Sequence, residues 1–91
     1  MPTPRYPKFP ELGVITVRTE DGLHVIDVDE DSPAAAAGIE TGDTLTRLDD
    51  TSLRDRSDLG RALAELSWGD VPSITLIRDN ESRTIELALR R

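Results

Sequence analysis

Residues 32–43 read SPAAAAGIETGD, and their residue types predict a short helix with both ends marked. Ser32 fits the N-cap, where its hydroxyl can accept a hydrogen bond from a first-turn amide, and Pro33 fits the first helical position, where no donor is needed. Gly38 fits the left-handed position that ends a helix, and Gly42 adds a second flexible point. A helix this short is unstable alone, so its alanines are expected to pack closely against neighbouring elements.

Patterns typical of strands and of a second helix surround this stretch. An apolar stripe with helical spacing predicts the longer helix over 56–66, in which Leu59, Ala62 and Leu66 are expected to enter the core. β-branched and alternating apolar residues predict strands over 12–18, 23–28, 43–49, 73–79 and 83–89. Close strands without a long crossover favour the α+β class, with a largely antiparallel sheet or partial barrel of five to six strands and two helices.

The composition excludes several classes of function. The 91 residues make one domain with a net charge of −7, from 11 basic and 18 acidic side chains. Phosphate contacts need clustered Lys and Arg, so nucleic acid and direct membrane contact are not expected. No apolar run approaches the ~20 residues of a membrane span, and the N-terminus lacks the apolar stretch of a signal peptide. Cysteine is absent, which excludes disulfides and thiolate zinc sites.

The first ten residues differ from the rest. Residues 1–10 hold four of the six prolines, which indicates an extended lead-in or the end of a linker before a domain at 11–91.

Ile15 and Val17 should point away from any groove beside the first strand. They are expected either to pack under the lead-in, against Tyr6 or Phe9, or to leave an apolar edge open to another chain.

The residues that catalysis needs are missing from recognisable settings. His24 is the single histidine and lies in a strand pattern, which favours a surface or edge histidine over a base or a metal ligand. No serine has a G-x-S-x-G setting, and a cap explains Ser32. The acidic stretch that begins at Asp27 lacks the glycine and glutamate of a calcium loop, so a solvated loop is the better interpretation. We expect no catalytic residue, no metal site and no cofactor.

Residues 32–53 resemble the central stretch of bacterial and archaeal PDZ domains, which begins S-P-A-x-x-A-G-(apolar)-x-x-G-D. SDLGRALAEL is similar to the groove helix of that family, LIRDNESRTIELAL to its last hairpin, and ELGV at 11–14 to its carboxylate-binding loop. The residues that carry the central match are Ser32, Pro33, Ala34, Ala37, Gly38, Ile39, Gly42, Asp43, Leu45, Leu48, Asp49 and Leu53. The resemblance spans residues 11–90 and implies a PDZ-like fold.

The order of elements is similar to the permuted PDZ type of HtrA/DegP serine proteases, site-two metalloproteases and carboxy-terminal processing proteases. Three features depart from the family pattern. Asp50 stands where a turn glycine is common, and DNES, in the last hairpin, also lacks glycine. Only TEDG separates the first two strands, where HtrA domains often carry a helical insertion.

The resemblance implies capture of protein C-termini or extended segments between the strand at 14–18 and the helix at 56–66, by addition of a strand to the sheet edge. The ligand carboxylate would meet the backbone amides of Leu12, Gly13 and Val14, with charge added through water by Lys8 or Arg5. Its terminal side chain would enter a pocket, and Arg56 would favour an acidic residue upstream in the ligand. The implied peptide-binding residues are Leu12, Gly13, Val14, Thr16, Arg56, Gly60 and Leu63.

Two functions therefore stay open. One is a regulatory or substrate-recognition module of a larger protease, monomeric in isolation, that binds peptides of other proteins. The other is a structural interaction domain that docks within its parent protein or self-associates, without binding free peptides. An enzyme in its own right is not expected. The sequence predicts neither the parent protein, the ligand sequence nor the compartment.

Overall fold

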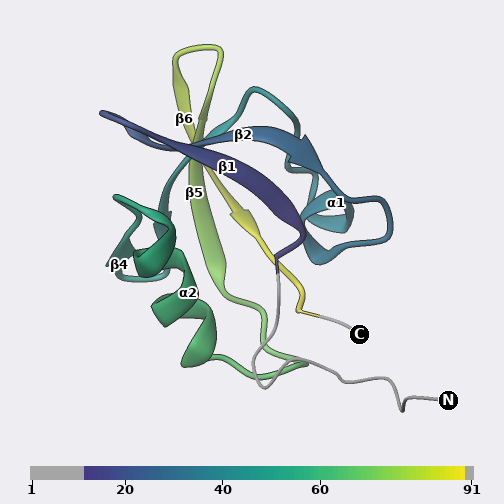
Figure 1. Cartoon of the computed structure of the whole chain (residues 1–91). Helices are drawn as coiled ribbons and strands as arrows, with labels where there is room; N and C mark the ends of the chain where they lie inside the picture. Colours follow the sequence, from purple (N-terminus) through teal and green to yellow (C-terminus); the bar gives the residue numbers. More distant parts are fainter. Residues whose placement is uncertain (1–11, 90–91) are drawn as a thin grey trace, which may run out of the picture.

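The computed structural model describes residues 12–89, so the segment 1–10, with the predicted lead-in and its Lys8, Arg5, Tyr6 and Phe9, lies outside the described residues. Three pairs of consecutive strands are separated by two helices along the chain, as drawn in Figure 1. The elements are β1 (Val14–Thr19), β2 (Gly22–Val28), α1 (Pro33–Ala37), β3 (Thr44–Leu48), β4 (Thr51–Ser52), α2 (Arg56–Ala64), β5 (Ser73–Arg78) and β6 (Glu81–Glu86).

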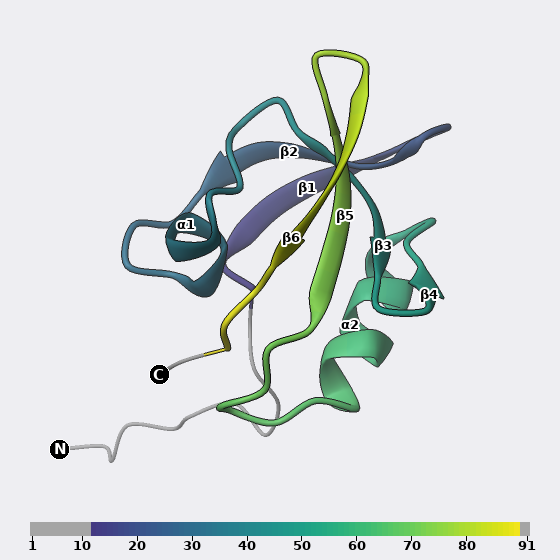
Figure 2. The same cartoon turned by 180° about the vertical axis from the view of Figure 1, so that it is seen from behind.

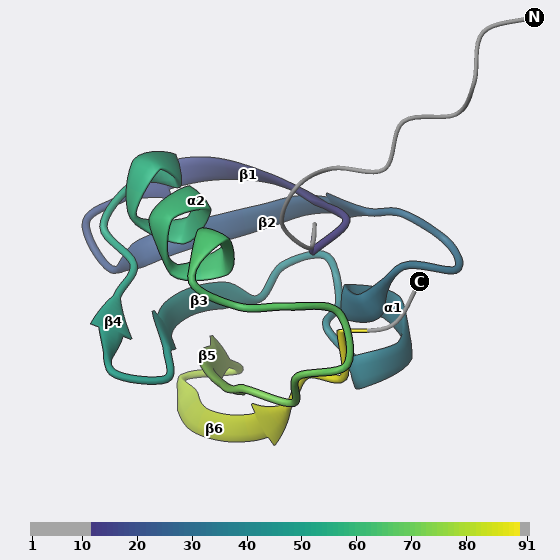
Figure 3. The same cartoon turned by 90° about the horizontal axis from the view of Figure 1, so that it is seen from below.

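The strands form one antiparallel sheet. Its order is β1-β2-β3-β5-β6, and the short β4 pairs with β3 beside this path. Among the described residues β1 pairs only with β2, so β1 is an edge strand. The sheet curls so that α2 lies beside β1, whereas α1 lies near the C-terminal end of β2 (Figures 2 and 3). The predicted α+β fold, an antiparallel partial barrel of five to six strands with two helices, is confirmed.

The core lies between the concave side of the sheet and α2. Leu59 and Ala62 enter it from α2 and Leu66 packs against it from just beyond the helix, as predicted. The fully buried large apolar side chains come from the inner strands β2, β3 and β5 and from the segments that follow β4 and β6; they are Leu23, Val25, Leu45, Leu48, Leu53, Ile74, Leu76, Leu87 and Leu89. The core thus holds the inner strands together, and β1 is placed by its pairing with one of them, β2.

Both ends of α1 follow the sequence prediction. The Ser32 hydroxyl accepts a hydrogen bond from the amide of Ala35 at 3.2 Å, and Pro33 occupies the first turn. Gly38 ends the helix in the left-handed region with φ 93°. Gly42, with φ 101°, donates its amide to the Val25 carbonyl and so fastens the following loop to β2.

The last hairpin differs from the prediction. Asp79 and Asn80 have φ of 52° and 65°, so they make a two-residue turn of the type that suits twisted strands, without glycine. β6 therefore begins at Glu81 rather than at residue 83. It ends at Glu86 rather than at residue 89, because the amides of Leu87 and Leu89 bond outside the strand ladder, to Pro72 and Asp70.

Other boundaries also differ. β1 begins at Val14 rather than at residue 12, because Gly13 has φ 86° and interrupts the extended backbone. α2 ends at Ala64 rather than at residue 66, and its N-cap is Asp55, whose side chain accepts the amide of Asp58. Sequence reasoning did not predict β4, because a strand of two residues is too short to show periodicity.

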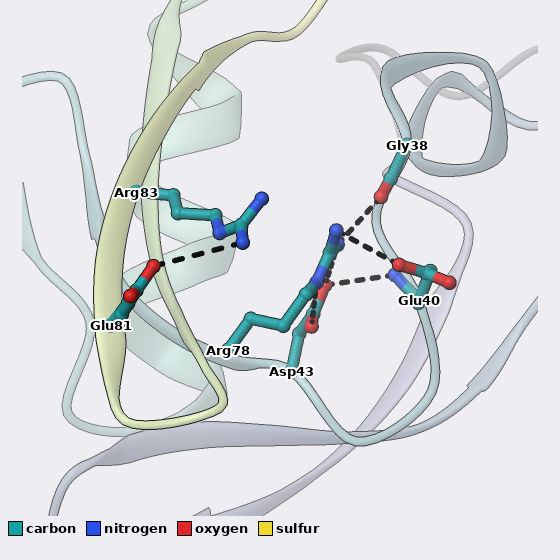
Figure 4. Close-up of polar contacts among 6 residues, drawn as sticks. All are labelled: Gly38, Glu40, Asp43, Arg78, Glu81 and Arg83. Carbon is teal, nitrogen blue, oxygen red and sulfur yellow. Dashed lines mark hydrogen bonds and ion pairs between the residues drawn. The ribbon is translucent and has the colours of Figure 1, made fainter.

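Arg78, at the end of β5, fixes the loop after α1 (Figure 4). Its guanidinium donates two hydrogen bonds to the Asp43 carboxylate, at 2.8 and 2.6 Å, although Asp43 is only 2% exposed. The same group donates to the Gly38 carbonyl at 2.8 Å and pairs with Glu40 at 2.8 Å. Asp43 also accepts the amide of Glu40 at 2.9 Å. Arg78 thus joins β5 to the end of α1 and to the start of β3.

The pairing sets the protonation of Asp43. Burial raises the pKa of this carboxyl, but the hydrogen bonds from Arg78 and the Glu40 amide outweigh burial and hold the pKa below its ordinary value. A carboxyl whose pKa is lower in the folded state stabilises the fold above its unfolded pKa of about 3.9, and this contribution is lost as the pH falls through the folded pKa.

We predict that Arg78→Met lowers the free energy of unfolding by about 3 kcal/mol at neutral pH, because it leaves a buried carboxylate unpaired. The difference from the unmodified protein should shrink below about pH 4, where Asp43 of the variant is protonated. Urea unfolding at a series of pH values measures both effects. Arg83→Met is the matched control, because Arg83 pairs with Glu81 only at 3.8 Å on the surface. Equal losses in the two variants, or a loss independent of pH, would contradict the prediction.

Candidate functional site

The loop that enters β1 presents backbone amides to the side of the sheet that faces α2. The Leu12 carbonyl accepts the amide of Ala34 at 3.0 Å, and the Gly13 carbonyl accepts the amide of Asp29 at 2.9 Å. In a trans peptide the N–H points opposite to the C=O, and no peptide bond among the described residues is cis. The amides of Gly13 and Val14 therefore point away from α1 and β2. Adjacent amides pointing the same way form a concavity suited to an anion.

Gly13 is required by two independent features of this loop. Its φ of 86° is a conformation that side chains with a Cβ rarely adopt. A Cβ at this position would also lie 2.2 Å from the Cβ of Ser32, the N-cap of α1. The loop therefore rests directly on the first turn of α1, which explains why small residues occur at both places.

The seven residues that the sequence predicted for the site surround one depression of about 260 Å³ between β1 and α2. They are Leu12, Gly13, Val14, Thr16, Arg56, Gly60 and Leu63. Leu12 and Leu63 are buried and supply apolar surface, and Arg56 is exposed. Space for a Cβ at Gly60 is open, with no heavy atom within 4 Å, so glycine at this position widens the depression.

Two further residues line the depression. Leu59 is buried there as well as in the core. Asp29 is exposed beside the amide-bearing loop, and it is followed by the exposed carboxylates Glu30 and Asp31. Sequence reasoning treated this acidic stretch as a solvated loop and did not place it beside the site. The sequence does place the acidic stretch immediately before the Ser32 cap, and the loop of Gly13 contacts Ser32. That order could have placed Asp29 beside the loop.

The outer face of β1 carries apolar side chains away from the depression. Ile15 and Val17 are 49% and 44% exposed, as expected for residues that point away from the groove. Ile26 of β2 is also exposed, at a point where the pairing with β1 shifts register. Together these three side chains form an exposed apolar patch on the hairpin.

Other kinds of site find no support in the described part of the chain. Within residues 12–89 there is no group of three or more His, Asp or Glu side chains arranged to hold a metal ion. His24 faces the Thr44 hydroxyl at 3.4 Å in the sheet and does not line the depression. No helix in these residues is both long and apolar enough to cross a membrane.

Known proteins share the fold and part of the sequence. The serine protease Do-like HtrA of Lactococcus lactis subsp. lactis (strain IL1403) is 34% identical over 70 residues, which are 77% of this chain and 17% of that protein. The chain thus spans less than a fifth of this relative. A crystal structure of an aminopeptidase N family protein from Idiomarina loihiensis has a TM-score of 0.82 and 27% identity, over 98% of this chain and 15% of that one.

A second solved structure is of domain size. The HtrA3 PDZ domain bound to a phage-derived ligand, FGRWV, has a TM-score of 0.74 and 21% identity, over 87% of this chain and 83% of that one. The family model described as the PDZ domain matches residues 10–89. PDZ domains are non-catalytic, in agreement with the expectation that this chain is not itself an enzyme. By this match along nearly its whole length, the chain belongs to the PDZ domain family.

Proposed function

We propose that the depression between β1 and α2 captures the free C-terminus of an extended peptide. The observation that carries this proposal is the pair of amides of Gly13 and Val14, which point outward at one end of a free strand edge. A carboxylate accepts strong, charge-assisted hydrogen bonds from such amides. The adjoining apolar surface of Leu12 and Leu63 suits a terminal apolar side chain.

The rest of the peptide adds a strand to the sheet. The Asp29-to-Gly13 bond makes Val14 and Val28 a pair that does not exchange hydrogen bonds, so the N–H and C=O of Val14 point to the free edge. By strand alternation the backbone groups of Thr16 point the same way. Main-chain bonds supply affinity that tolerates many sequences, and the pocket beside Leu63 supplies preference at the terminal residue.

We also propose that the domain serves a larger protease as a regulatory or substrate-recognition module. The identity to an HtrA protease and the solved HtrA3 PDZ domain with a peptide ligand support this proposal. The likeness to part of an aminopeptidase N family protein shows that a similar domain also occurs in a different kind of parent protein. We further propose that the isolated domain is monomeric.

One observation favours a second function. The exposed patch of Ile15, Val17 and Ile26 is suited to contact with another surface, either in the parent protein or in a second copy of the chain. In that case the domain is a structural interaction module. Binding of free peptides distinguishes the two functions, because the patch lies on the face opposite the depression.

We predict that peptides with free C-termini bind and that their C-terminal amides bind about thirtyfold more weakly, because amidation removes a charged hydrogen bond worth about 2 kcal/mol. Fluorescence anisotropy against a peptide library, each member in both forms, measures this difference. Gly60→Phe should abolish binding by filling the depression, and it should keep the melting temperature, because it removes a mid-helix glycine. Glu65→Phe, at the exposed end of α2, is the matched control and should bind normally. Acid and amide forms binding equally would overturn terminal capture.

We predict that Asp29→Asn tightens binding of free-acid peptides by about two- to threefold at low ionic strength, because it removes an exposed like charge beside the amides. The backbone hydrogen bond from residue 29 to Gly13 is unaffected by this change. Amidated peptides should show no such gain, and added salt should screen it. Peptide titrations of Asp29→Asn measure this gain. Glu81→Gln, which removes an exposed carboxylate at the turn of the last hairpin, is the control and should show no gain. A gain that is the same for acid and amide peptides would contradict it.

A further inference from the structure

We propose that the groove continues beyond Thr16 into a basic subsite formed by Arg18, Arg54 and Arg56, which selects an acidic side chain about four residues before the terminal residue of the ligand. This inference rests on the proposed capture of peptide C-termini and names the class of peptide that the groove prefers. It extends the role that the sequence suggests for Arg56 to residues from two further segments of the chain.

A second depression lies at the far end of β1. It has a volume of about 640 Å³ and lies between the β1–β2 turn and β4. Arg18 lines it from the β1 side and Arg54 from the segment between β4 and α2. Arg56, two residues further along the chain at the start of α2, lines the first depression. The two depressions thus follow one another along β1, which runs beside α2 (Figure 3).

The strand geometry determines which ligand residue reaches Arg18. Val14, Thr16 and Arg18 alternate along β1, so their backbone groups share the free edge and their side chains share the inner face. A peptide that pairs antiparallel with this edge, with its terminal residue at Val14, places its residues two and four positions upstream opposite Thr16 and Arg18. Directly opposed residues present their side chains to the same face. The upstream side chain and Arg18 therefore meet over the second depression.

Three arginines at this end of the groove are available to pair with an anion. Within residues 12–89, Arg18, Arg54 and Arg56 are exposed and form no ion pair, whereas Arg61, Arg78 and Arg83 each pair with a carboxylate. Asp58 accepts the backbone amide of Arg54 at 2.9 Å and so fixes the chain at this point. The side chain of Asp58 pairs with Arg61 and lines neither depression.

Three carboxylates limit where the acidic side chain of the ligand can lie. Glu20 and Asp21 form the β1–β2 turn and line the outer end of the second depression. Asp29 borders the opposite end of the groove, beside the amides of Gly13. An anionic ligand residue is therefore disfavoured near the turn and next to Asp29, and it is favoured in between, opposite Arg18. Guanidinium groups suit this role because they bind carboxylates through paired hydrogen bonds.

The test uses the free-acid peptide that binds best in the acid-and-amide screen, synthesised with Glu, Gln or Lys four residues before its last. Affinity should fall in the order Glu, Gln, Lys, with about a fivefold difference between Glu and Gln at low salt, because these pairs are exposed. The difference should shrink with added salt. Arg18→Gln should remove most of the preference for Glu and leave the affinity of the Gln peptide unchanged.

Arg47→Gln is the matched control, because Arg47 of β3 is exposed, forms no ion pair among the described residues and lines neither depression. It should keep the preference for Glu. If all three peptides bind equally and amidation still weakens binding, the basic subsite is overturned and terminal capture stands. A preference for Glu that survives the triple change of Arg18, Arg54 and Arg56 to Gln would also overturn it. Absence of any binding would overturn both proposals.

Discussion

The bond between Arg78 and Asp43 is the constraint on which the shape of the candidate site depends. A buried carboxylate needs a partner, and Arg78 provides one from the neighbouring strand β5 while also donating to the Gly38 carbonyl. This fixes the C-terminal end of α1. The other end of α1 holds the Leu12–Gly13 loop, through the Ala34 amide and contact at Ser32. A helix of five residues is thus held at both ends. Because one end is bonded to β5 and the other to the Leu12–Gly13 loop, the position of these loop amides depends on the position of β5.

Small residues serve two different purposes in this arrangement. Gly13 and Ala34 allow backbones to approach closely, so that the loop can be held by direct hydrogen bonds to α1. Gly60 instead leaves space empty, at a cost of about 1 kcal/mol of helix stability relative to alanine. The first kind of position stabilises the shape of the site, and the second keeps it open. Larger residues at Gly13 or Ala34 are therefore expected to disturb the loop, whereas a larger residue at Gly60 is expected to fill the groove and leave the fold intact.

The sequence alone predicts the fold and seven of the nine residues that line the depression between β1 and α2. The caps of α1 and the apolar stripe of α2 are local signals. The resemblance to PDZ domains predicts that α2 lies beside β1. Three features are not predictable locally. The turn at Asp79 and Asn80 uses left-handed backbone without glycine, and the start of β6 at Glu81 follows from it. The partner of Asp43 lies 35 residues away, at Arg78. The nearness of Asp29 to the loop of Gly13 depends on how β1 and β2 are paired.

The most direct test of the central claim is an amide NMR titration of the domain with its best free-acid peptide. Capture of the terminal carboxylate predicts the largest shifts at the amides of Gly13 and Val14, with smaller shifts along β1 and at Gly60 of α2. At the same concentration the amidated peptide should shift the amides of Gly13 and Val14 much less. Shifts confined to Ile15, Val17 and Ile26 would instead place the contact on the outer patch and contradict the account. Equal shifts of the Gly13 and Val14 amides with the free-acid and the amidated peptide would also contradict it.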